Sequence, residues 1–170
     1  MNPMRNELTR GDIQQMQEEL DYRRITLRPR LLEEVKTARA FGDLSENFEY
    51  KAAKQEKNRN ESRIRYLENM IKSAVIINDR SGADTIGLYD TVTIYIEEDE
   101  EEETFRLVTT MRQDALQGYI SKESPVGRAL MGKRVGDTVH IQVNDDFGYD
   151  AVIRSVVKGS DDGSIPISSY

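Results

Sequence analysis

The chain has 170 residues, which suits one domain or two small ones, and it contains neither Cys nor Trp. Without Cys, disulfides and thiolate zinc sites are excluded, and a reducing compartment is expected. Charged residues make up 32% and hydrophobic residues 37% of the chain, which excludes one large globule and is typical of exposed helices beside a modest core.

The net charge of −7 is unevenly distributed along the chain. Residues 1–80 carry 16 Lys and Arg against 14 Asp and Glu, a balance of +2, whereas residues 81–170 carry 8 against 17, a balance of −9. This asymmetry predicts two modules with different surroundings. It disfavours a protein that wraps duplex DNA, because such proteins need a broadly basic face.

The first ten residues carry charges where a signal peptide would need an apolar core. No stretch of the sequence is apolar for long enough to cross a bilayer. We therefore expect a soluble, cytoplasmic protein that has no membrane partner.

Two long helical patterns follow. The segment Thr9-Arg10-Gly11-Asp12 has the spacing of a capping box, which predicts a helix that starts near Thr9. Its apolar positions are Ile13, Met16, Leu20, Leu27, Leu31, Val35 and Ala38. A second pattern has the alternating three- and four-residue steps of a heptad repeat. Its positions are Tyr50, Ala53, Lys57, Asn60, Ile64, Leu67, Ile71 and Ala74.

The two patterns predict an antiparallel coiled-coil hairpin over residues 1–78. In such a hairpin, facing residues have numbers with a constant total, and these positions pair with totals of 87 or 88, as in Leu20 with Leu67 and Val35 with Ala53. Half of that total places the turn at Leu44, within the tip, which we define as the sequence GDLSEN at residues 42–47. Pairing of two helices between chains is the rival interpretation. The constant total favours the intramolecular hairpin, and hence a monomer.

Two irregularities interrupt the hairpin pattern. Pro29 falls inside the first helix, where it removes a hydrogen bond and costs about 3 kcal/mol unless a kink absorbs it. The apolar register also shifts between Leu20 and Leu27, which predicts a bend there. Lys57 and Asn60 place polar side chains on the second helix's apolar positions, a device that fixes register in coiled coils.

The rest of the chain predicts a compact α+β domain at residues 85–158, after a polar linker at residues 79–84. Strands are expected at 90–96 and 103–110, joined by a solvated acidic turn at 97–102. A short helix spans 124–132, with Ser124 as its cap, Pro125 at its first position and Gly132 after its end. A last hairpin joins 136–143 to 149–157, and the polar tail at 159–170 is expected to be disordered.

Only carboxylates remain as candidates for chemistry. His140 is the single histidine and lies in an expected strand, and no Gly-rich phosphate loop precedes a helix. Asp43 and Glu46 have the spacing of a capping pattern, with Asp43 as N-cap and Glu46 reaching back. Alternatively, both help to hold a Mg²⁺ ion whose other ligands come from a partner. Spacing alone leaves both interpretations open.

Two stretches carry a family resemblance. The sequence ARAFGDLSENFEYKAAK (residues 38–54) resembles the tip signature of the bacterial GreA/GreB transcript cleavage factors, and ISKESPVGRALMGKRVGDTV (residues 120–139) resembles that family's second motif. The similarity runs from about Thr9 to Lys158. It implies a coiled coil that enters the secondary channel of RNA polymerase and an FKBP-like domain that docks at the channel rim. The acidic balance resembles GreA more than GreB.

The resemblance also implies roles for individual residues. Asp43 and Glu46 would hold Mg²⁺ jointly with the polymerase, whose own active centre then cuts backtracked RNA near its 3′ end. The tip would be supported by Ser45, Asn47, Phe48 and Tyr50. The sequence itself makes the helix behind the tip basic, which predicts either a surface that attracts the extruded RNA or only a solvated helix face. These basic residues are Lys51, Lys54, Lys57 and Arg59, followed by Arg63 and Arg65. Docking to the polymerase would involve Ser124, Pro125, Arg128 and Gly132.

Phe48 departs from the family pattern, which often has a small residue there, and an exposed aromatic side chain at this position would contact RNA or polymerase or alter the packing of the tip. Three other functions remain open. One keeps the fold but makes the chain a channel-binding regulator or inhibitor without cleavage activity. A prolyl isomerase is suggested by the FKBP-like domain, although no aromatic pocket can be identified. A coiled-coil scaffold that dimerises through its helices is the third.

Overall fold

The computed structural model describes residues 7–42 and 47–169, and these fold as two compact units. One unit, Ile13–Ala74, is the helical hairpin, and the other combines the chain before Ile13 with the chain from Val75 onward. The predicted fold class, a helical hairpin followed by an α+β domain, is confirmed. No helix in the described ranges has the length and apolar character needed to span a membrane.

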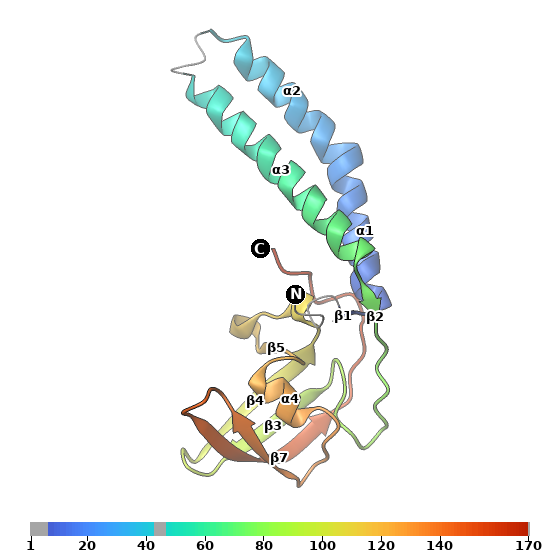
Figure 1. The fold of residues 1–170 in the computed structure, drawn as a ribbon, viewed down its shortest axis with the longest axis vertical. Helices are drawn as coiled ribbons and strands as arrows, with labels where there is room; N and C mark the ends of the chain where they lie inside the picture. The colour runs from blue at the N-terminus through green and yellow to red at the C-terminus, as the bar shows by residue number, and fades with distance from the viewer. Residues whose placement is uncertain (1–6, 43–46, 170) are drawn as a thin grey trace. The chain divides into compact units, whose positions relative to one another are not determined.

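The first arm of the hairpin consists of α1 (Arg10–Tyr22), the π-helical segment η2 (Arg23–Leu27) and α2 (Arg28–Arg39). The predicted capping box starts it. Thr9 Oγ1 accepts a hydrogen bond from Asp12 N at 3.1 Å, and Asp12 Oδ2 accepts one from Thr9 N at 3.0 Å. The second arm is α3 (Phe48–Lys72), which runs beside α2 in Figure 1.

The predicted irregularity in the first arm is the π-helical segment. The backbone N–H of Arg28 bonds to Arg23 O, five residues back, so this stretch contains one residue more than a regular helix would use. That extra residue accounts for the step in the pairing totals from 87 below it to 88 above it. It also lets α2 restart with Pro29 in its first turn, where a missing N–H costs no bond.

Apolar and polar side chains both hold the arms together. Met16, Leu20, Ile64 and Leu67 are buried along the predicted apolar positions. Asn60 is also buried, and its amide bonds to Arg23, accepting from Nη1 at 2.9 Å and donating to the backbone oxygen at 3.3 Å. Such a buried, satisfied amide fixes one register between the arms.

Ion pairs between the arms fix the same register. Arg63 is only 6% exposed and donates from Nε and Nη2 to the two oxygens of Glu19, at 2.9 and 3.1 Å. Arg28 makes a similar bidentate ion pair with Glu61, donating from Nε and Nη2 to the two carboxylate oxygens at 2.8 and 2.9 Å.

The second unit contains a five-stranded sheet in the order β5-β4-β3-β7-β6. The strands are β3 (Thr91–Ile96), β4 (Glu101–Val108), β5 (Tyr119–Ser121), β6 (Thr138–Gln142) and β7 (Gly148–Val157). All neighbours are antiparallel except β4 and β5. Alternate residues of β3, namely Val92, Ile94 and Ile96, enter a core that Leu130 of α4 (Pro125–Leu130) helps to close.

The boundary between the units differs from the predicted boundary near residue 78. Short strands β1 (Glu7–Leu8) and β2 (Val75–Ile76) pair in parallel and belong to the sheet-containing unit. Leu8 is fully buried there, and Lys122 pairs with Glu7 at 2.5 Å. The helical periodicity could not show this, because both strands are two residues long and carry no alternating pattern of their own.

The tail at residues 159–169, for which the composition predicts disorder, makes contacts with the rest of its unit. Ile165 is 2% exposed and packs in a second apolar cluster with Leu88, Tyr89 and Val108. Ser168 N donates to Met111 O at 2.7 Å, just after β4, in η3 (Thr110–Arg112). The polar composition of the tail gave no sign that Ile165 would be buried or that Asp161 would bond to Arg112.

Candidate functional site

The end of the hairpin is the candidate site, because the resemblance assigns the chemistry to it. The arms stop at Arg39 and at Phe48, so the chain reverses between them as the pairing totals predict. The reversal of the chain begins at Gly42, whose φ of +124° is a backbone conformation that residues with a Cβ rarely adopt. Asp43, Ser45 and Glu46 lie outside the described residues.

Asn47 joins the two arms at the tip. It is the N-cap of α3, since its Oδ1 accepts a hydrogen bond from Tyr50 N at 2.9 Å. Its Nδ2 donates to Ala38 O at the end of α2, at 2.7 Å. The capping interpretation of Asp43 is therefore wrong for this helix, because Asn47 occupies the N-cap position.

Tyr50 lies beside positive charge from both arms. Arg39 donates from Nη2 to its hydroxyl at 3.2 Å, and the guanidinium carbon lies 5.4 Å from the ring centroid. The hydrogen bond from Arg39 lowers the pKa of the Tyr50 hydroxyl, and the charges of Arg39, Lys54 and Lys57 add to this effect. A lowered phenol pKa marks a positive potential behind the tip.

The basic residues of α3 separate into two groups. Lys51, Lys54 and Arg59 are exposed, and Lys57 is half-buried. Arg59 pairs with Glu56 at 3.0 Å, and the carboxylate of Glu56 offsets the positive charge of Arg59. Arg63 does not belong to the basic surface, because it is buried against Glu19, whereas Arg65 is exposed and bonds to Ser62.

Two exposed aromatic side chains flank the tip in the sequence. Phe48, the first residue of α3, is 79% exposed, with Lys51 Nζ 5.5 Å from its ring centroid. Phe41 is 72% exposed and lines an open groove of about 370 Å³ between α2 and α3. The sequence predicted a role for Phe48 but missed Phe41. Phe41 lies outside the apolar positions of the helical pattern, and this could have indicated an exposed ring.

The predicted docking residues surround α4. Ser124 Oγ accepts from Gly127 N at 3.0 Å and donates to Ser121 O at 2.7 Å, so its hydroxyl caps the helix. Pro125 takes the first turn, and Gly132 has φ +79° just after the end. Arg128 presents an exposed side chain, 3.9 Å from a carboxylate oxygen of Glu123.

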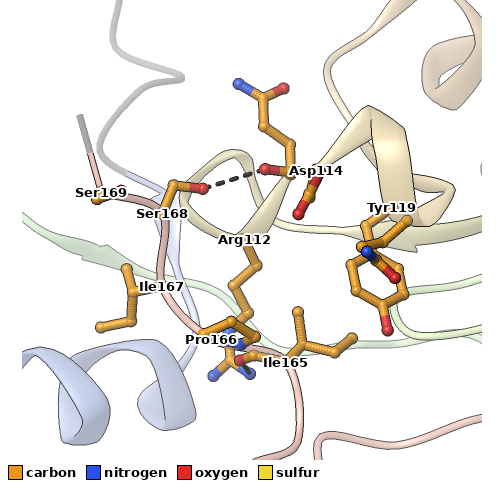
Figure 2. A pocket seen from close by; sticks show the side chains of 10 residues that line it. Arg112, Asp114, Tyr119, Ile165, Pro166, Ile167, Ser168 and Ser169 are labelled. Atoms are coloured by element: carbon orange, nitrogen blue, oxygen red, sulfur yellow. Dashed lines mark hydrogen bonds between the residues drawn. The ribbon is translucent and has the colours of Figure 1, made fainter.

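A buried ion network in the sheet-containing unit was not predicted. Arg112 is 1% exposed and donates from Nε to Asp12 at 2.5 Å. Its other nitrogens reach the tail, bonding to both oxygens of Asp161 at 2.9 and 2.8 Å and to Ile165 O at 3.2 Å. Figure 2 shows Arg112 beside Ile165 and Pro166, at one side of a pocket of about 560 Å³ that the tail helps to line.

Within residues 7–42 and 47–169, no three Asp, Glu, His or Cys side chains gather in a way that could hold a metal ion. The donor set at the tip consists of the two carboxylates of Asp43 and Glu46. Carboxylate oxygens suit Mg²⁺, which prefers one or two protein carboxylates and completes its octahedral coordination with water or phosphate oxygens. The chemistry of the tip therefore fits a Mg²⁺ ion that a second molecule also holds.

Comparison with known proteins gives consistent matches. Residues 6–76 match the family model "Transcription elongation factor, N-terminal", and residues 81–156 match "Transcription elongation factor, GreA/GreB, C-term". The transcription elongation factor GreA of Geobacillus kaustophilus is 44% identical over 136 residues, which are 79% of this chain and 86% of that relative. GreA of Bacillus subtilis is 42% identical over 129 residues, 76% and 82% of the two chains. A crystal structure of GreA factor homolog 1 from Thermus thermophilus has 27% identity and a TM-score of 0.41, and the likeness covers 89% of this chain and 98% of that one.

Proposed function

Because the chain belongs to the GreA/GreB family of transcription elongation factors, we propose that it stimulates RNA polymerase to cleave backtracked RNA. The hairpin enters the polymerase's secondary channel, and the sheet-containing unit docks at the rim. The cleaving active centre belongs to the polymerase, so the chain acts as a cofactor of that reaction. Release of the 3′ fragment lets elongation resume.

The observation that supports this proposal is the ending of the hairpin. Its arms stop at Arg39 and Phe48, and Asn47 caps the second arm while bonding to the first. Helix capping therefore requires neither Asp43 nor Glu46. Because Asn47 caps α3, the two carboxylates are not needed as caps. Carboxylates at the end of a long, narrow helical hairpin suit delivery of negative charge into a channel.

The two tip carboxylates would bind one Mg²⁺ together with the polymerase. A bound Mg²⁺ supplies activation of the attacking water and stabilisation of the leaving oxygen in phosphodiester cleavage. Asp43 and Glu46 would orient that water. Two carboxylates alone bind Mg²⁺ weakly, because the ion keeps its waters, so the isolated chain is not expected to act as a nuclease.

The test is to convert each tip acid to its amide. Asp43→Asn and Glu46→Gln keep the size and hydrogen-bonding capacity of the side chains but remove a charged ligand. We expect each to lower Mg²⁺-dependent cleavage in a stalled, backtracked complex by at least about tenfold, since even outer-sphere partners are worth that much at metal sites. Helix content should stay unchanged, because Asn47 provides the cap.

Glu49→Gln is the matched control, an identical change at an exposed position in the first turn of α3. It should leave cleavage intact, and affinity for polymerase should be similar in all three variants. Cleavage at the normal rate by both tip variants would refute the assignment. If the unmodified protein binds polymerase without promoting cleavage, the chain is instead a channel-binding regulator.

A further inference from the structure

Phe48 presents an aromatic face that the fold does not use. It is the first residue of α3, and at 79% exposed it is the most exposed aromatic side chain among the large hydrophobic residues described. A ring left in water forfeits the free energy of burial, so the fold gains nothing by placing it there. The cap of the helix is complete without it, because Asn47 supplies the N-cap hydrogen bond.

The charges around Phe48 indicate what the ring can bind. Lys51 Nζ lies 5.5 Å from the ring centroid, one helical turn along α3, and Lys54 is exposed one turn further. A flat apolar ring beside two ammonium groups matches a nucleotide, which offers a base to stack and a phosphate to neutralise. The lowered pKa of Tyr50 agrees, since Arg39, Lys54 and Lys57 contribute positive charge there.

Phe41 provides an internal comparison at the same end of the hairpin. It is nearly as exposed as Phe48, but its groove is lined by the carboxylates of Glu33, Glu34 and Glu49 and by one cation, Arg30. Phosphates would be repelled from that groove. Exposure alone therefore does not distinguish the two rings, whereas the contact with a cation does: Lys51 lies over the ring of Phe48, and Arg30, the cation that lines the groove of Phe41, pairs with Glu34.

We propose that Phe48 stacks on a base of the single-stranded RNA extruded into the channel, while Lys51 and Lys54 hold the adjoining phosphates. This proposal rests on the proposed function, because that function brings the RNA to the tip. It assigns Phe48 a positioning role: the stacked base holds the RNA at the start of α3. The ring adds affinity without choosing a sequence, because every base has a face that can stack.

The experiment compares Phe48→Leu with Phe48→Tyr in backtracked complexes, with Phe41→Leu as the matched control. Leu keeps an apolar side chain but removes the ring, and Tyr keeps the ring. We expect Phe48→Leu to raise the concentration of factor that half-saturates cleavage by at least about fivefold, the size of one base–aromatic stack. Phe48→Tyr and Phe41→Leu should stay within about twofold of the unmodified protein.

A second arm replaces the extruded nucleotides with abasic ones. With no base to stack, the unmodified protein and Phe48→Leu should half-saturate cleavage at the same concentration. An undiminished difference between these two concentrations would overturn the proposal. Affinity for polymerase without extruded RNA is measured in parallel. A loss there in Phe48→Leu would show that the ring contacts the polymerase instead. Failure of the proposed function is distinct, because the unmodified protein would then not promote cleavage on any RNA.

Discussion

At the scale of single residues, Gly11 shows how closely the tail approaches the start of α1. A Cβ at this position would lie 1.9 Å from Asp161 Oδ2 and 3.4 Å from Arg112 Nη2. A flexible carboxylate normally moves aside, but Asp161 is held by both terminal nitrogens of a buried arginine. The space beside Gly11 is therefore occupied by a group that cannot leave without breaking an ion pair.

We predict that Gly11→Ala destabilises the protein by about 1–3 kcal/mol, the usual cost of overpacking. On an exposed helix the same change stabilises by up to about 1 kcal/mol, so the sign is diagnostic. In an Asp161→Ala background the obstacle is gone, and Gly11→Ala should then be neutral or stabilising. Urea unfolding of the four proteins in this cycle provides the measurement. Stabilisation by Gly11→Ala in the otherwise unmodified chain would contradict the prediction.

Residue-level predictions succeeded where the signal was local. Thr9 with Asp12, and Ser124 with Gly127, are hydrogen-bonded caps whose partners lie three residues away, so sequence spacing reveals them. Arg112 and Asp161 are 49 residues apart, and nothing in either neighbourhood indicates the other. Near the tip, spacing suggested Asp43 as the cap, but Asn47 occupies that position by accepting from Tyr50 N, and it also donates to Ala38 O on the other arm.

At the scale of elements, the π-helical segment sets the register of the tip. Below it, Glu19 pairs with Arg63, and above it Arg28 pairs with Glu61, so each side of the segment is fixed against α3. The heptad pattern revealed the change of phase between Leu20 and Leu27. It could not distinguish a kink at Pro29 from an inserted residue, because both interrupt the apolar positions in the same way.

Ile25 lies in this segment and is 75% exposed. We predict that its deletion prevents α1 and α2 from packing on α3 in their present registers at the same time. A regular helix would turn α2 by about 100° relative to α1. Either the Arg28–Glu61 pair breaks or the tip rotates away from its working position. Cleavage activity should fall strongly, and thermal unfolding followed by far-UV circular dichroism should shift to lower temperature.

Ile25→Ala separates loss of the side chain from loss of the residue. Because the side chain is mostly exposed, this substitution should change stability by about 0.5 kcal/mol or less. Equal stability and activity of the deletion and substitution variants would show that the extra residue has no role.

At the scale of the whole molecule, the two units differ in how they carry charge. The hairpin has several ion pairs between its arms, as in Glu19 with Arg63, whereas the sheet-containing unit has most of the excess acid, concentrated at residues 97–103. The uneven charge predicted two modules, and the structure confirms them. The sequence could not show that the chain before Ile13 and the tail join the same unit, since their contacts are long-range.

This difference predicts a specific sensitivity of the hairpin to acid. Burial raises the pKa of Glu19, but hydrogen bonds and charges from Arg63 and Arg23 outweigh it, so the pKa lies below its ordinary value. A lowered folded-state pKa contributes stability that is complete above the ordinary value and is lost as pH falls through the folded value. We expect Glu19→Gln to cost about 1–3 kcal/mol at neutral pH and progressively less below about pH 4.

Glu61→Gln is the control for this pH series. Its partner Arg28 also lowers the pKa of Glu61, but the Arg28 side chain is 36% exposed, against 7% for Arg63. Solvent screens that pair, so the control should lose less stability at neutral pH. Helix content measured against pH and urea distinguishes the two variants. A difference between Glu19→Gln and the unmodified chain that is the same at every pH would refute the linkage.

The tail's contact with Arg112 has a consequence for biosynthesis. A ribosome releases Arg112 well before Asp161 and Ile165, so a nascent chain must keep that guanidinium hydrated, or only partly neutralised, while translation continues. The sheet-containing unit can therefore finish folding only after nearly all of the described sequence has emerged. A translational pause before residue 161 would prolong the lifetime of a half-assembled unit and its exposure to proteases.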